Sequence, residues 1–576
     1  MHVVLRFFIV FCLFGSWAMG QSVPRDFFYS DYNPTTGTAT FVNSVLGWDL
    51  FFNSGFKGQS TVIGNLEGGT IWSGHEVFAR PTTEANSFHT YVNPAAGSVN
   101  EMDYHATMVG HVLAGSGYQS VNGGVYTYLG LGMAPEATVI SGGIATGFSS
   151  SSPGSFSTTT SSVVTAYRAF FQGVGLGTGV ARPDVINSSW GGGDSAATEP
   201  EYLAMDGLAR QNASVAFVAS AGNSGIDPVA APASGFNNIS VGSLGGASFL
   251  QPSSFSSRGL ADFHLPGANG GTTLTGVRVA VDLAAPGENL VLAAYIGDTG
   301  TLGVDPAWVN DVQTPSPTDL YFTSADGTSF SSPIVAGGVA LLKDGAKTIL
   351  STNLTNALDT RVVKSVLMAG SKMTEGWDNK QNAMNVTTQA LDARTGAGAM
   401  DLEGAATVYY SGTRDVAGSL GGAIQKDGWD SATIHLGSTT EYKFSSTFTE
   451  EMSIAIALNW FADRGFDDAT ETGSEIAFAN LDLQLWSLDE NGNFVTMVGG
   501  SMSTYNNTEV LRIASLAAGN YGLRVVFDDM VYDSTNAVTD EAYGLAWRAE
   551  VIPEPSAEIL LAGASCMLCF GRRRKF

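Results

Sequence analysis

The stretch that decides the fold is Gly327-Thr328-Ser329-Phe330-Ser331-Ser332-Pro333, which continues as IVAGGVALLKDGAK to Lys347. A tight glycine turn leads here into a long segment with the small and apolar spacing of a buried helix. Ser329 stands at the start of that helix, where backbone amides and a partial positive charge favour a developing anion. Because a serine at this place is also an ordinary helix cap, the stretch indicates catalysis only together with other groups.

The chain around this helix alternates between β-rich and helical segments. The expected strands are 61–66, 137–144, 184–190, 214–222, 238–244 and 279–287. The expected helices are 105–115, 163–174, 201–211, 332–347 and 360–370. Such alternation predicts an α/β fold, doubly wound, whose mostly parallel sheet has helices on both faces. The Ser/Thr-rich stretch 149–162 interrupts the alternation and is expected to be a surface loop.

After Tyr410 helical periodicity ends, and short alternating strands separated by turns predict an all-β, jelly-roll-like sandwich over residues 411–550. Acidic residues dominate this region. Four of them are candidate ligands for a structural calcium ion, although their spacing is not that of an EF-hand: Asp463, Asp467, Asp468 and Asp482.

Composition narrows the classes of function. The 576 residues include 27 Lys and Arg against 53 Asp and Glu, a net charge of −26, which makes nucleic acid an improbable partner. The three cysteines are Cys12, Cys566 and Cys569, all in the terminal segments. The body of the chain therefore folds without disulfides and has no thiol nucleophile.

The two ends carry targeting features. Arg6, an apolar run and the small-x-small end Ala18-Met19-Gly20 predict a signal peptide at residues 1–20. The segment 551–576 has Pro553-Glu554-Pro555, a short apolar run and a basic end, and it resembles the PEP-CTERM sorting signal of Gram-negative bacteria. That resemblance implies export to the cell envelope, outer surface or medium, an exosortase-type partner and transient membrane contact through the tail.

A second motif, His105 to Gly115 (HATMVGHVLAG), places a histidine at the opening of a helix of small residues. A general base that faces a serine needs such a close approach to another backbone. His111, two turns later, is expected to be structural. The two histidines lack the HExxH spacing of a zinc site, so a metallohydrolase is the weaker alternative.

Together these segments resemble the subtilisin-like serine proteases, the subtilase family (peptidase S8). The serine motif Gly-Thr-Ser-x-x-x-Pro is matched by 327–333, and the histidine motif is matched with departures by 105–111. Residues 185–191 resemble the substrate-binding strand, and 219–225 resemble the strand and loop that carry the oxyanion asparagine. The resemblance covers about 55–406, within a predicted catalytic domain of 55–410 preceded by an N-terminal arm at 21–54.

The resemblance implies a role for each matching residue. Ser329 would attack the scissile carbonyl of a polypeptide, and His105 would take and return the proton. Asn223 would donate to the oxyanion, and the loss of one such donor typically lowers the rate by about 10²–10³-fold. The backbone of Ser189, Trp190 and Gly191 would pair with the substrate as an added strand. Residues 229–232 would line the pocket for the substrate side chain before the cleaved bond. No cofactor is required for this chemistry.

The acid of the triad departs from the family pattern. Where the family has Asp-Thr-Gly or Asp-Ser-Gly after the first core strand, this chain has Glu67 before Gly68-Gly69. Glu67 stands in the right chain order, and a glutamate can fill the orienting role. Asp103 is nearer to His105 in sequence but badly placed to reach its ring, and His75 with Glu76 are expected to shape the loop or the substrate cleft. If Glu67 does not fill the role, the chain would be a weak or inactive binding protein of the envelope or matrix.

Overall fold

The computed structural model describes residues 42–78, 88–97, 100–122, 125–149, 155–295, 322–415 and 422–552. The predicted signal peptide, the first half of the predicted N-terminal arm and the sorting tail from residue 553 lie outside the described residues. Among the helices in the described ranges, none is both long and apolar enough to cross a membrane.

A central sheet of eight strands forms the middle of the predicted catalytic domain. Seven strands lie side by side in the order β11 (Gln251–Pro252), β10 (Ile239–Gly245), β9 (Ala216–Ser220), β8 (Val185–Ser188), β1 (Val62–Glu67), β5 (Thr138–Gly143) and β2 (Phe88–Tyr91), with β14 (Leu283–Pro286) also beside β10. Every pair is parallel except β10 with β11. The carboxyl ends of the parallel strands therefore meet along one edge, where α/β sheets place their sites.

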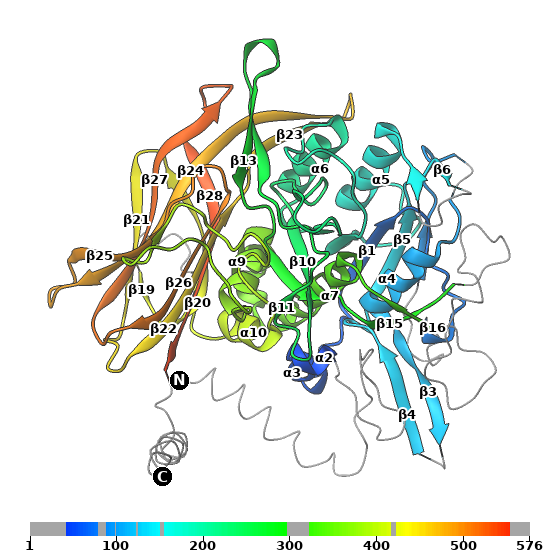
Figure 1. Ribbon diagram of the computed structural model, residues 1–576, viewed down its shortest axis with the longest axis horizontal. Coiled ribbons are helices and arrows are strands. Elements are labelled where there is room, and N and C mark those ends of the chain that lie inside the picture. Colours follow the sequence, from blue (N-terminus) through cyan, green and yellow to red (C-terminus); the bar gives the residue numbers. More distant parts are fainter. Residues whose placement is uncertain are drawn as a thin grey trace, which may run out of the picture.

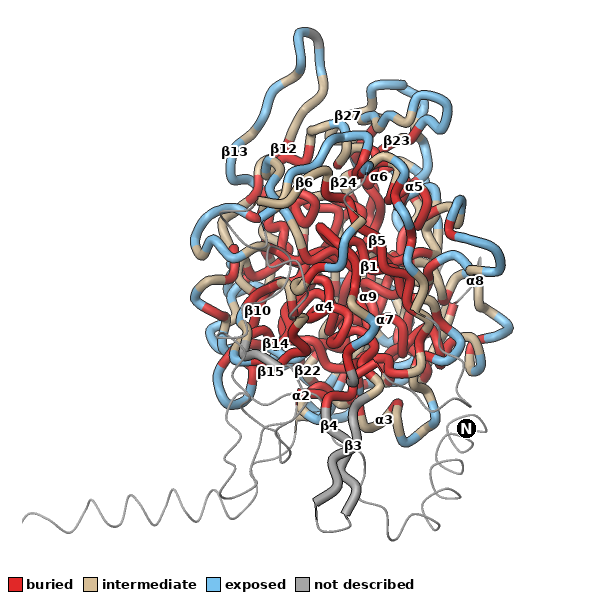
Figure 2. Tube along the Cα trace, turned by 90° about the vertical axis from the view of Figure 1, so that its right-hand side faces the viewer, coloured by how far each residue is buried: buried red, intermediate tan, exposed pale blue. Residues whose placement is uncertain are grey.

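Both faces of this sheet are buried, because successive side chains of a strand point to opposite sides. Val185 and Val218 face one apolar cluster, whereas Ile186 and Phe217 face the other. The first cluster includes helices α4 (Tyr104–Ala114), α7 (Thr328–Ile349), α9 (Thr360–Gly370) and α10 (Leu402–Tyr410), and the second includes α5 (Thr160–Gln172) and α6 (Pro200–Gln211). Figure 2 shows the buried residues filling the middle of the molecule around β1, β5, α4 and α7. The predicted doubly wound α/β fold is confirmed.

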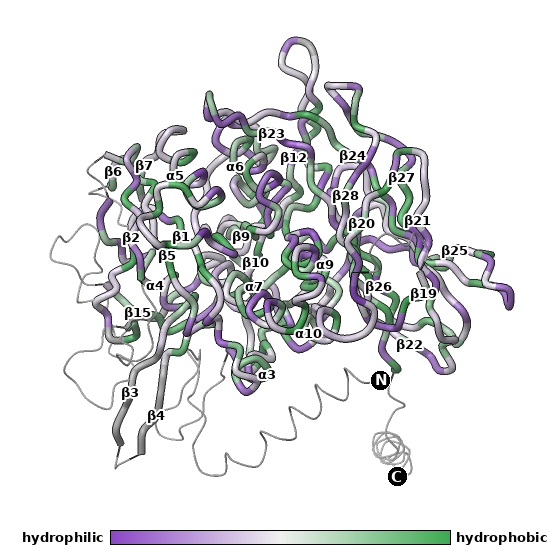
Figure 3. Tube along the Cα trace, turned by 180° about the vertical axis from the view of Figure 1, so that it is seen from behind, coloured by the Kyte–Doolittle hydropathy of each residue, from purple (hydrophilic) through white to green (hydrophobic). Residues whose placement is uncertain are grey.

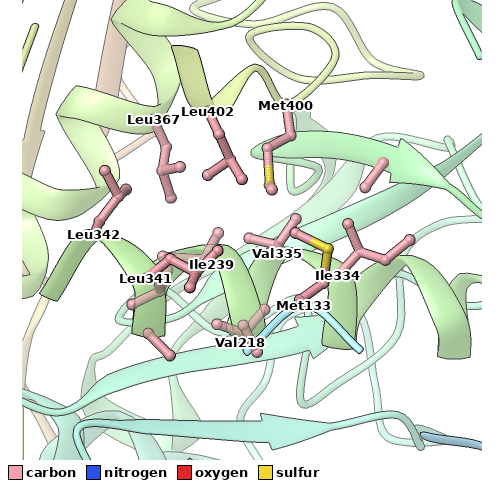
Figure 4. Close-up of a cluster of buried hydrophobic side chains, with 14 of the residues drawn as sticks. Met133, Val218, Ile239, Ile334, Val335, Leu341, Leu342, Leu367, Met400 and Leu402 are labelled. Atoms are coloured by element: carbon pink, nitrogen blue, oxygen red, sulfur yellow. The ribbon is translucent and has the colours of Figure 1, made fainter. Parts of the chain in front are cut away.

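Helix α7, which carries the serine motif, lies in the centre of the first cluster. Figure 4 shows its apolar side chains packed between the sheet and the segments on its other side; the labelled residues are Met133, Val218, Ile239, Ile334, Val335, Leu341, Leu342, Leu367, Met400 and Leu402. Burial on all sides explains why the helix is apolar around its whole circumference instead of along one stripe.

The end of the predicted N-terminal arm is part of this core. Two short helices, α2 (Val42–Val45) and α3 (Trp48–Asn53), are separated by Gly47, whose φ of 76° suits glycine. Trp48 is fully buried and its indole donates to the carbonyl of Met133 at 2.7 Å. The amide of Leu402 donates to the carbonyl of Leu46 at 2.8 Å. The end of the arm is thus hydrogen-bonded both to Met133 and to the first residue of α10.

Three antiparallel pairs flank the main sheet of the predicted catalytic domain. They are β3 (Ser116–Asn122) with β4 (Val125–Leu131), β6 (Gly147–Phe148) with β7 (Phe156–Ser157), and β12 (Ala261–Leu265) with β13 (Thr272–Arg278). A further pair, β15 (Leu290–Ala293) with β16 (Phe322–Ala325), leads into α7. The stretch 149–162 is therefore not wholly a loop, since β7 and the cap of α5 lie in it.

The C-terminal half is a β-sandwich, as predicted. One sheet has the order β17 (Val386–Thr387), β25 (Phe494–Ser501), β24 (Thr472–Leu488), β27 (Tyr521–Asp533), β21 (Ser438–Phe444) and β19 (Ala423–Ile424), with β23 (Asp463–Asp467) also on β24. The other has the order β18 (Thr413–Arg414), β20 (Asp427–His435), β28 (Asp540–Val551), β22 (Met452–Trp460) and β26 (Thr508–Leu516). Leucine and aromatic side chains from both sheets form one core.

The sandwich packs directly on the predicted catalytic domain. Helices α9 and α10 lie between α7 and the strands β20, β22 and β28, and Figures 1 and 3 show this order from opposite sides. Gly544 of β28 approaches the backbone of Arg361 so closely that a Cβ would lie 2.5 Å from the nitrogen of Val362. Ser365 of α9 donates to the carbonyl of Gly544 at 2.7 Å. The two parts are thus joined by a close, hydrogen-bonded interface.

Candidate active site

Glu67, His105 and Ser329 are brought to one place by three different elements. Glu67 is the last residue of β1, His105 lies in the first turn of α4, and Ser329 is the second residue of α7. The carboxylate of Glu67 is fully buried and uses both oxygens. Its Oε2 lies 3.1 Å from His105 Nδ1, and its Oε1 accepts from the backbone nitrogen of Ser189 at 2.7 Å. The longer glutamate side chain is therefore held at both oxygens.

Asp103, the alternative acid, has a different task. Its carboxylate caps α4 by accepting from the backbone nitrogens of His105 at 3.2 Å and Ala106 at 3.4 Å. Such a cap satisfies the free amides of the first turn. The carboxylate is engaged with the backbone, so it orients the helix that carries His105, and the ring contact comes from Glu67.

The electrostatic surroundings of His105 favour its protonated form. Partial burial by itself lowers the pKa of the imidazole, but the hydrogen bond and negative charge of Glu67, with the charge of Asp103, outweigh it. The net result is a pKa above the ordinary value of about 6.5. An imidazolium that forms during proton transfer is stabilised at this position.

Ser329 follows a turn that requires glycine. Gly327 has φ of 157°, a conformation that other residues rarely adopt. Ser329 is half-buried, and its Oγ donates to the carbonyl of Ser189 at 3.2 Å. The ring of the next residue, Phe330, lies 6.0 Å from that of His105. Among the described residues no hydrogen bond joins Ser329 to His105, and such bonds are often long before substrate binds.

Asn223 lies beside the serine with its amide orientation held. Its Oδ1 accepts from both the backbone nitrogen and the hydroxyl of Thr328, each at 2.9 Å. The hydroxyl of Thr328 in turn accepts from the nitrogen of Gly222 at 3.1 Å. The other end of the Asn223 amide, Nδ2, lies 3.5 Å from the position that a Cβ at Gly327 would take. This donor can face an oxyanion formed at Ser329.

A buried polar network under the site was missed by sequence reasoning. Asn187 donates to Asn65 Oδ1 and to the Ser189 hydroxyl, each at 3.1 Å, and accepts from Ser332 at 2.8 Å. It thereby ties β1, β8 and α7, the elements around Glu67, Ser189 and Ser329. Asn187 belongs to the motif 185–191, but Asn65 carries no motif, and only its place in a buried strand distinguishes it.

A cleft of about 580 Å³ adjoins the site on the side of His105, and Glu67, Asn223 and Ser329 are not among its lining residues. Its lining includes the predicted Ser189, Trp190 and Gly191 together with His105; the full lining is Asp103, Tyr104, His105, Ser155, Phe156, Thr158, Ser189, Trp190, Gly191, Gly192 and Tyr202. Phe156 and Tyr202 were not predicted, because one stands in the Ser/Thr-rich stretch and the other in an ordinary amphipathic helix. Their rings each lie 6.5 Å from that of Trp190.

The segment 229–232, predicted to line a substrate pocket, lies behind the cleft wall. Val229 and Ala231 are fully buried in the apolar core. The carbonyl of Ala231 accepts from the nitrogens of Gly192 at 3.0 Å and Gly193 at 3.2 Å. The segment supports the backbone of the wall and does not belong to the lining of the cleft.

His111 has the structural place that was expected. Its Nε2 donates to the carbonyl of Gly130 at 2.9 Å, and its Nδ1 accepts from the nitrogen of Ala293 at 3.0 Å. Burial, with the nearby His75, lowers the pKa of His111 to about 3. The neutral ring therefore holds two backbone segments together.

The four candidate calcium ligands do not come together. Asp463 pairs with Arg210, and Asp468 pairs with Arg168. Asp467 accepts from backbone nitrogens of its own turn, while burial and the charge of Asp528 raise the pKa of Asp482 to about 6. Within the described ranges, no three His, Cys, Asp or Glu residues are grouped so as to hold a metal ion.

Comparison with known proteins gives one family and several solved structures. A cold adapted subtilisin-like serine proteinase is 21% identical over 53% of this chain and 84% of its own, with a TM-score of 0.34. The serine protease of Aeromonas sobria is 12% identical over 93% of this chain and 98% of its own, with a TM-score of 0.47. The prenylagaramide maturation protease PagA is 18% identical over 63% of this chain and 98% of its own, with a TM-score of 0.40.

Among curated proteins none matches this chain significantly. The model of the subtilase family, peptidase S8, matches residues 51–398, which is more than half of the chain and includes every element that carries the site. The chain belongs to the subtilase family of serine peptidases.

Proposed function

We propose that this chain is an exported serine endopeptidase whose catalytic residues are Glu67, His105 and Ser329. The observation that supports the proposal most is the 3.1 Å contact between Glu67 Oε2 and His105 Nδ1, beside the helix start that carries Ser329. Membership of the subtilase family supports serine-type peptide hydrolysis, and the glutamate in place of aspartate is the feature particular to this chain.

In the acylation step His105 Nε2 accepts the proton of Ser329 while Oγ forms a bond to the scissile carbonyl carbon. Glu67 holds Nδ1–H and stabilises the imidazolium, so the ring presents the right nitrogen to the serine. The backbone nitrogen of Ser329 and Nδ2 of Asn223 donate to the oxyanion. His105 then gives its proton to the leaving amine as the C–N bond breaks, and water repeats the sequence to release the acid.

A polypeptide substrate would lie extended against the backbone of Ser189, Trp190 and Gly191, adding a strand whose hydrogen bonds place the scissile bond at Ser329. The Ser189 carbonyl now accepts from Ser329 Oγ at 3.2 Å. A substrate N–H that takes over this carbonyl would release the hydroxyl toward His105.

Export and sorting complete the proposal. The signal peptide at 1–20 would direct the chain out of the cytoplasm, and the tail at 551–576 would contact the membrane transiently and be cleaved by an exosortase-type enzyme. All three cysteines would leave with these two segments. The mature protein would then act at the envelope or outside a Gram-negative-type cell.

The pH dependence of turnover follows from the state of His105. Only the neutral ring can accept the serine proton, so kcat/KM is expected to fall as pH drops through the pKa of His105. Because Glu67 and Asp103 raise that pKa, kcat/KM should fall to half of its plateau value at a pH above 6.5. This fall is the acid limb of the profile. Initial rates on a peptide substrate between pH 5 and 9 would show it. An acid limb well below pH 6 would contradict the described surroundings of the ring.

Labelling with a fluorophosphonate probe tests the proposed function directly. The wild-type protein should form one adduct, located by peptide mass spectrometry at Ser329, and metal chelators should leave peptide hydrolysis unchanged. The variant Ser329→Ala should form none. If the wild type forms no adduct under conditions where a control protease reacts, and hydrolyses no peptide, the chain is a binding protein of subtilase fold. Loss of hydrolysis in chelator without labelling would favour a metallohydrolase.

A further inference from the structure

The aromatic wall of the cleft, Phe156, Trp190 and Tyr202, adjoins helices α5 and α6. Phe156 stands a few residues before α5, and the hydroxyl of Tyr167 in α5 accepts a hydrogen bond from the indole of Trp190 at 3.2 Å. Tyr202 lies in the first turn of α6. The positions of Trp190 and Tyr202 therefore depend on where α5 and α6 lie relative to each other.

A hairpin of the sandwich reaches onto these two helices. It consists of β23, a turn and the first part of β24, residues 463–480, and Figures 1 and 3 both place β23 against α6. Arg168 of α5 pairs with two carboxylates in the turn, Glu471 at 2.6 Å and Asp468 at 3.2 Å. Gln172, one helical turn later, donates to Asp468 at 2.7 Å.

The contact with α6 combines an ion pair of Arg210 with Asp463, a side-chain hydrogen bond and close backbone packing. The side chain of Gln211 donates to the carbonyl of Phe466 at 2.7 Å, and the Phe466 ring is buried in the apolar cluster that contains α5 and α6. A Cβ added at Gly207 would overlap the backbone of Gly465. A Cβ added at Gly473 would overlap the backbone of α6 at Leu203 and Ala204, immediately after Tyr202. Glycines at these positions allow the hairpin to lie directly on the helix.

We propose that the hairpin 463–480 positions α5 and α6, so that the sandwich determines how tightly the cleft holds an extended polypeptide. In the described structure the hairpin contacts α5 and α6, and also Phe236, Phe263 and His264, but none of the three proposed catalytic residues. Its influence is therefore on substrate binding and not on the chemical step. This inference rests on the proposed function, since it assigns the cleft to the substrate.

The variant Gly473→Ala tests the inference, because its methyl group would push the hairpin from α6 next to Tyr202. We expect KM for a hexapeptide substrate that reaches the wall to rise about tenfold, with kcat within about twofold of wild type. KM for a short dipeptide anilide and the rate of fluorophosphonate labelling should not change. This dependence on substrate length would not arise from a general loss of stability.

Gly522→Ala is the matched control. Gly522 lies in β27, and an added Cβ there would sit 2.7 Å from the carbonyl of Tyr442 and 2.8 Å from the Phe494 ring, within the sandwich itself. This variant crowds the sandwich to a similar degree without touching α5 or α6. It should lower the unfolding temperature in a thermal melt and leave KM for the hexapeptide unchanged.

A milder variant covers the case in which Gly473→Ala does not fold. Arg168→Ala removes a partly exposed ion pair and should raise KM for the hexapeptide about two- to fivefold, the range expected of such a pair. Arg168→Lys, which keeps a positive charge beside Glu471 and Asp468, should keep KM close to the wild-type value. Arg524→Ala, which breaks a similar pair with Glu441 at 2.6 Å between β27 and β21, outside the hairpin, should have no effect.

Two results would overturn the inference. If the wild type cleaves the hexapeptide but the folded Gly473→Ala and Arg168→Ala variants keep its KM, the hairpin does not position the wall. If Gly522→Ala raises KM as much as Gly473→Ala does, the effect is general destabilisation. If the wild type neither labels nor cleaves, the proposed function has failed first, and this inference fails with it.

Discussion

Ser329→Ala is expected to lower kcat for peptide hydrolysis by about 10⁶-fold, the size of the loss when subtilisin, a member of the same family, is deprived of its nucleophile. The residual rate would come from the oxyanion donors and from substrate binding. The only hydrogen bond of the Ser329 hydroxyl in the described residues is the 3.2 Å contact to Ser189, so the fold should be nearly unaffected. Steady-state kinetics with a fluorogenic peptide and a thermal melt would measure both.

Ser331→Ala provides the matched control for the nucleophile. Ser331 lies two residues later in the same helix, is fully buried, and donates to the carbonyl of Pro286 at 3.1 Å. Its loss should lower the free energy of unfolding by about 1 kcal/mol and leave kcat within a few-fold of wild type. Turnover by Ser329→Ala within tenfold of wild type would show that another group is the nucleophile.

Glu67→Gln is expected to lower kcat by about 10⁴-fold, as loss of the orienting carboxylate does in a serine protease triad. The amide oxygen can still accept from the Ser189 nitrogen, but the NH₂ group then faces His105 Nδ1 and favours the wrong tautomer. The substitution also removes the charge that raises the pKa of His105, so the acid limb should move to lower pH. Rate profiles against pH for the two proteins would show both effects.

Asp103→Asn separates the two candidate acids. Asparagine caps a helix about as well as aspartate, so α4 should begin at the same residue and kcat should stay within a few-fold of wild type. A small shift of the acid limb to lower pH is expected, because Asp103 also raises the pKa of His105. A large loss in Asp103→Asn with near-normal turnover in Glu67→Gln would reassign the orienting role.

The choice of acid shows where reasoning from sequence is weak. Asp103 is two residues from His105 and Glu67 is 38 residues away, yet the contact belongs to Glu67. In a helix, the residue before the first turn caps backbone amides instead of meeting a side chain of that turn. Chain order after a buried strand predicted the residue that contacts the His105 ring, and the carboxyl end of β1 that carries it lies between those of β5 and β8.

The aromatic wall could not be predicted. Phe156 comes from a serine-rich segment, Trp190 from a strand end and Tyr202 from a helix. No motif in the sequence around Phe156 or Tyr202 distinguishes them from ordinary surface residues. They share a cleft only because α5 and α6 pack side by side on one face of the sheet. The hairpin that braces those helices lies more than 250 residues further along the chain.

The sequence by itself determined the elements and the parts of the site that depend on neighbours in the chain. Periodicity predicts the parallel sheet, its helices and the sandwich, and the glycine turn before Ser329 predicts a serine at a helix start. These follow from local sterics and hydrogen bonding. The tertiary structure alone decided that Glu67 and Ser189 meet, that Asn65 and Asn187 join beneath the site, and that the sandwich braces the cleft. Those contacts depend on strand register and helix packing, which are set by the burial of apolar surface over the whole domain.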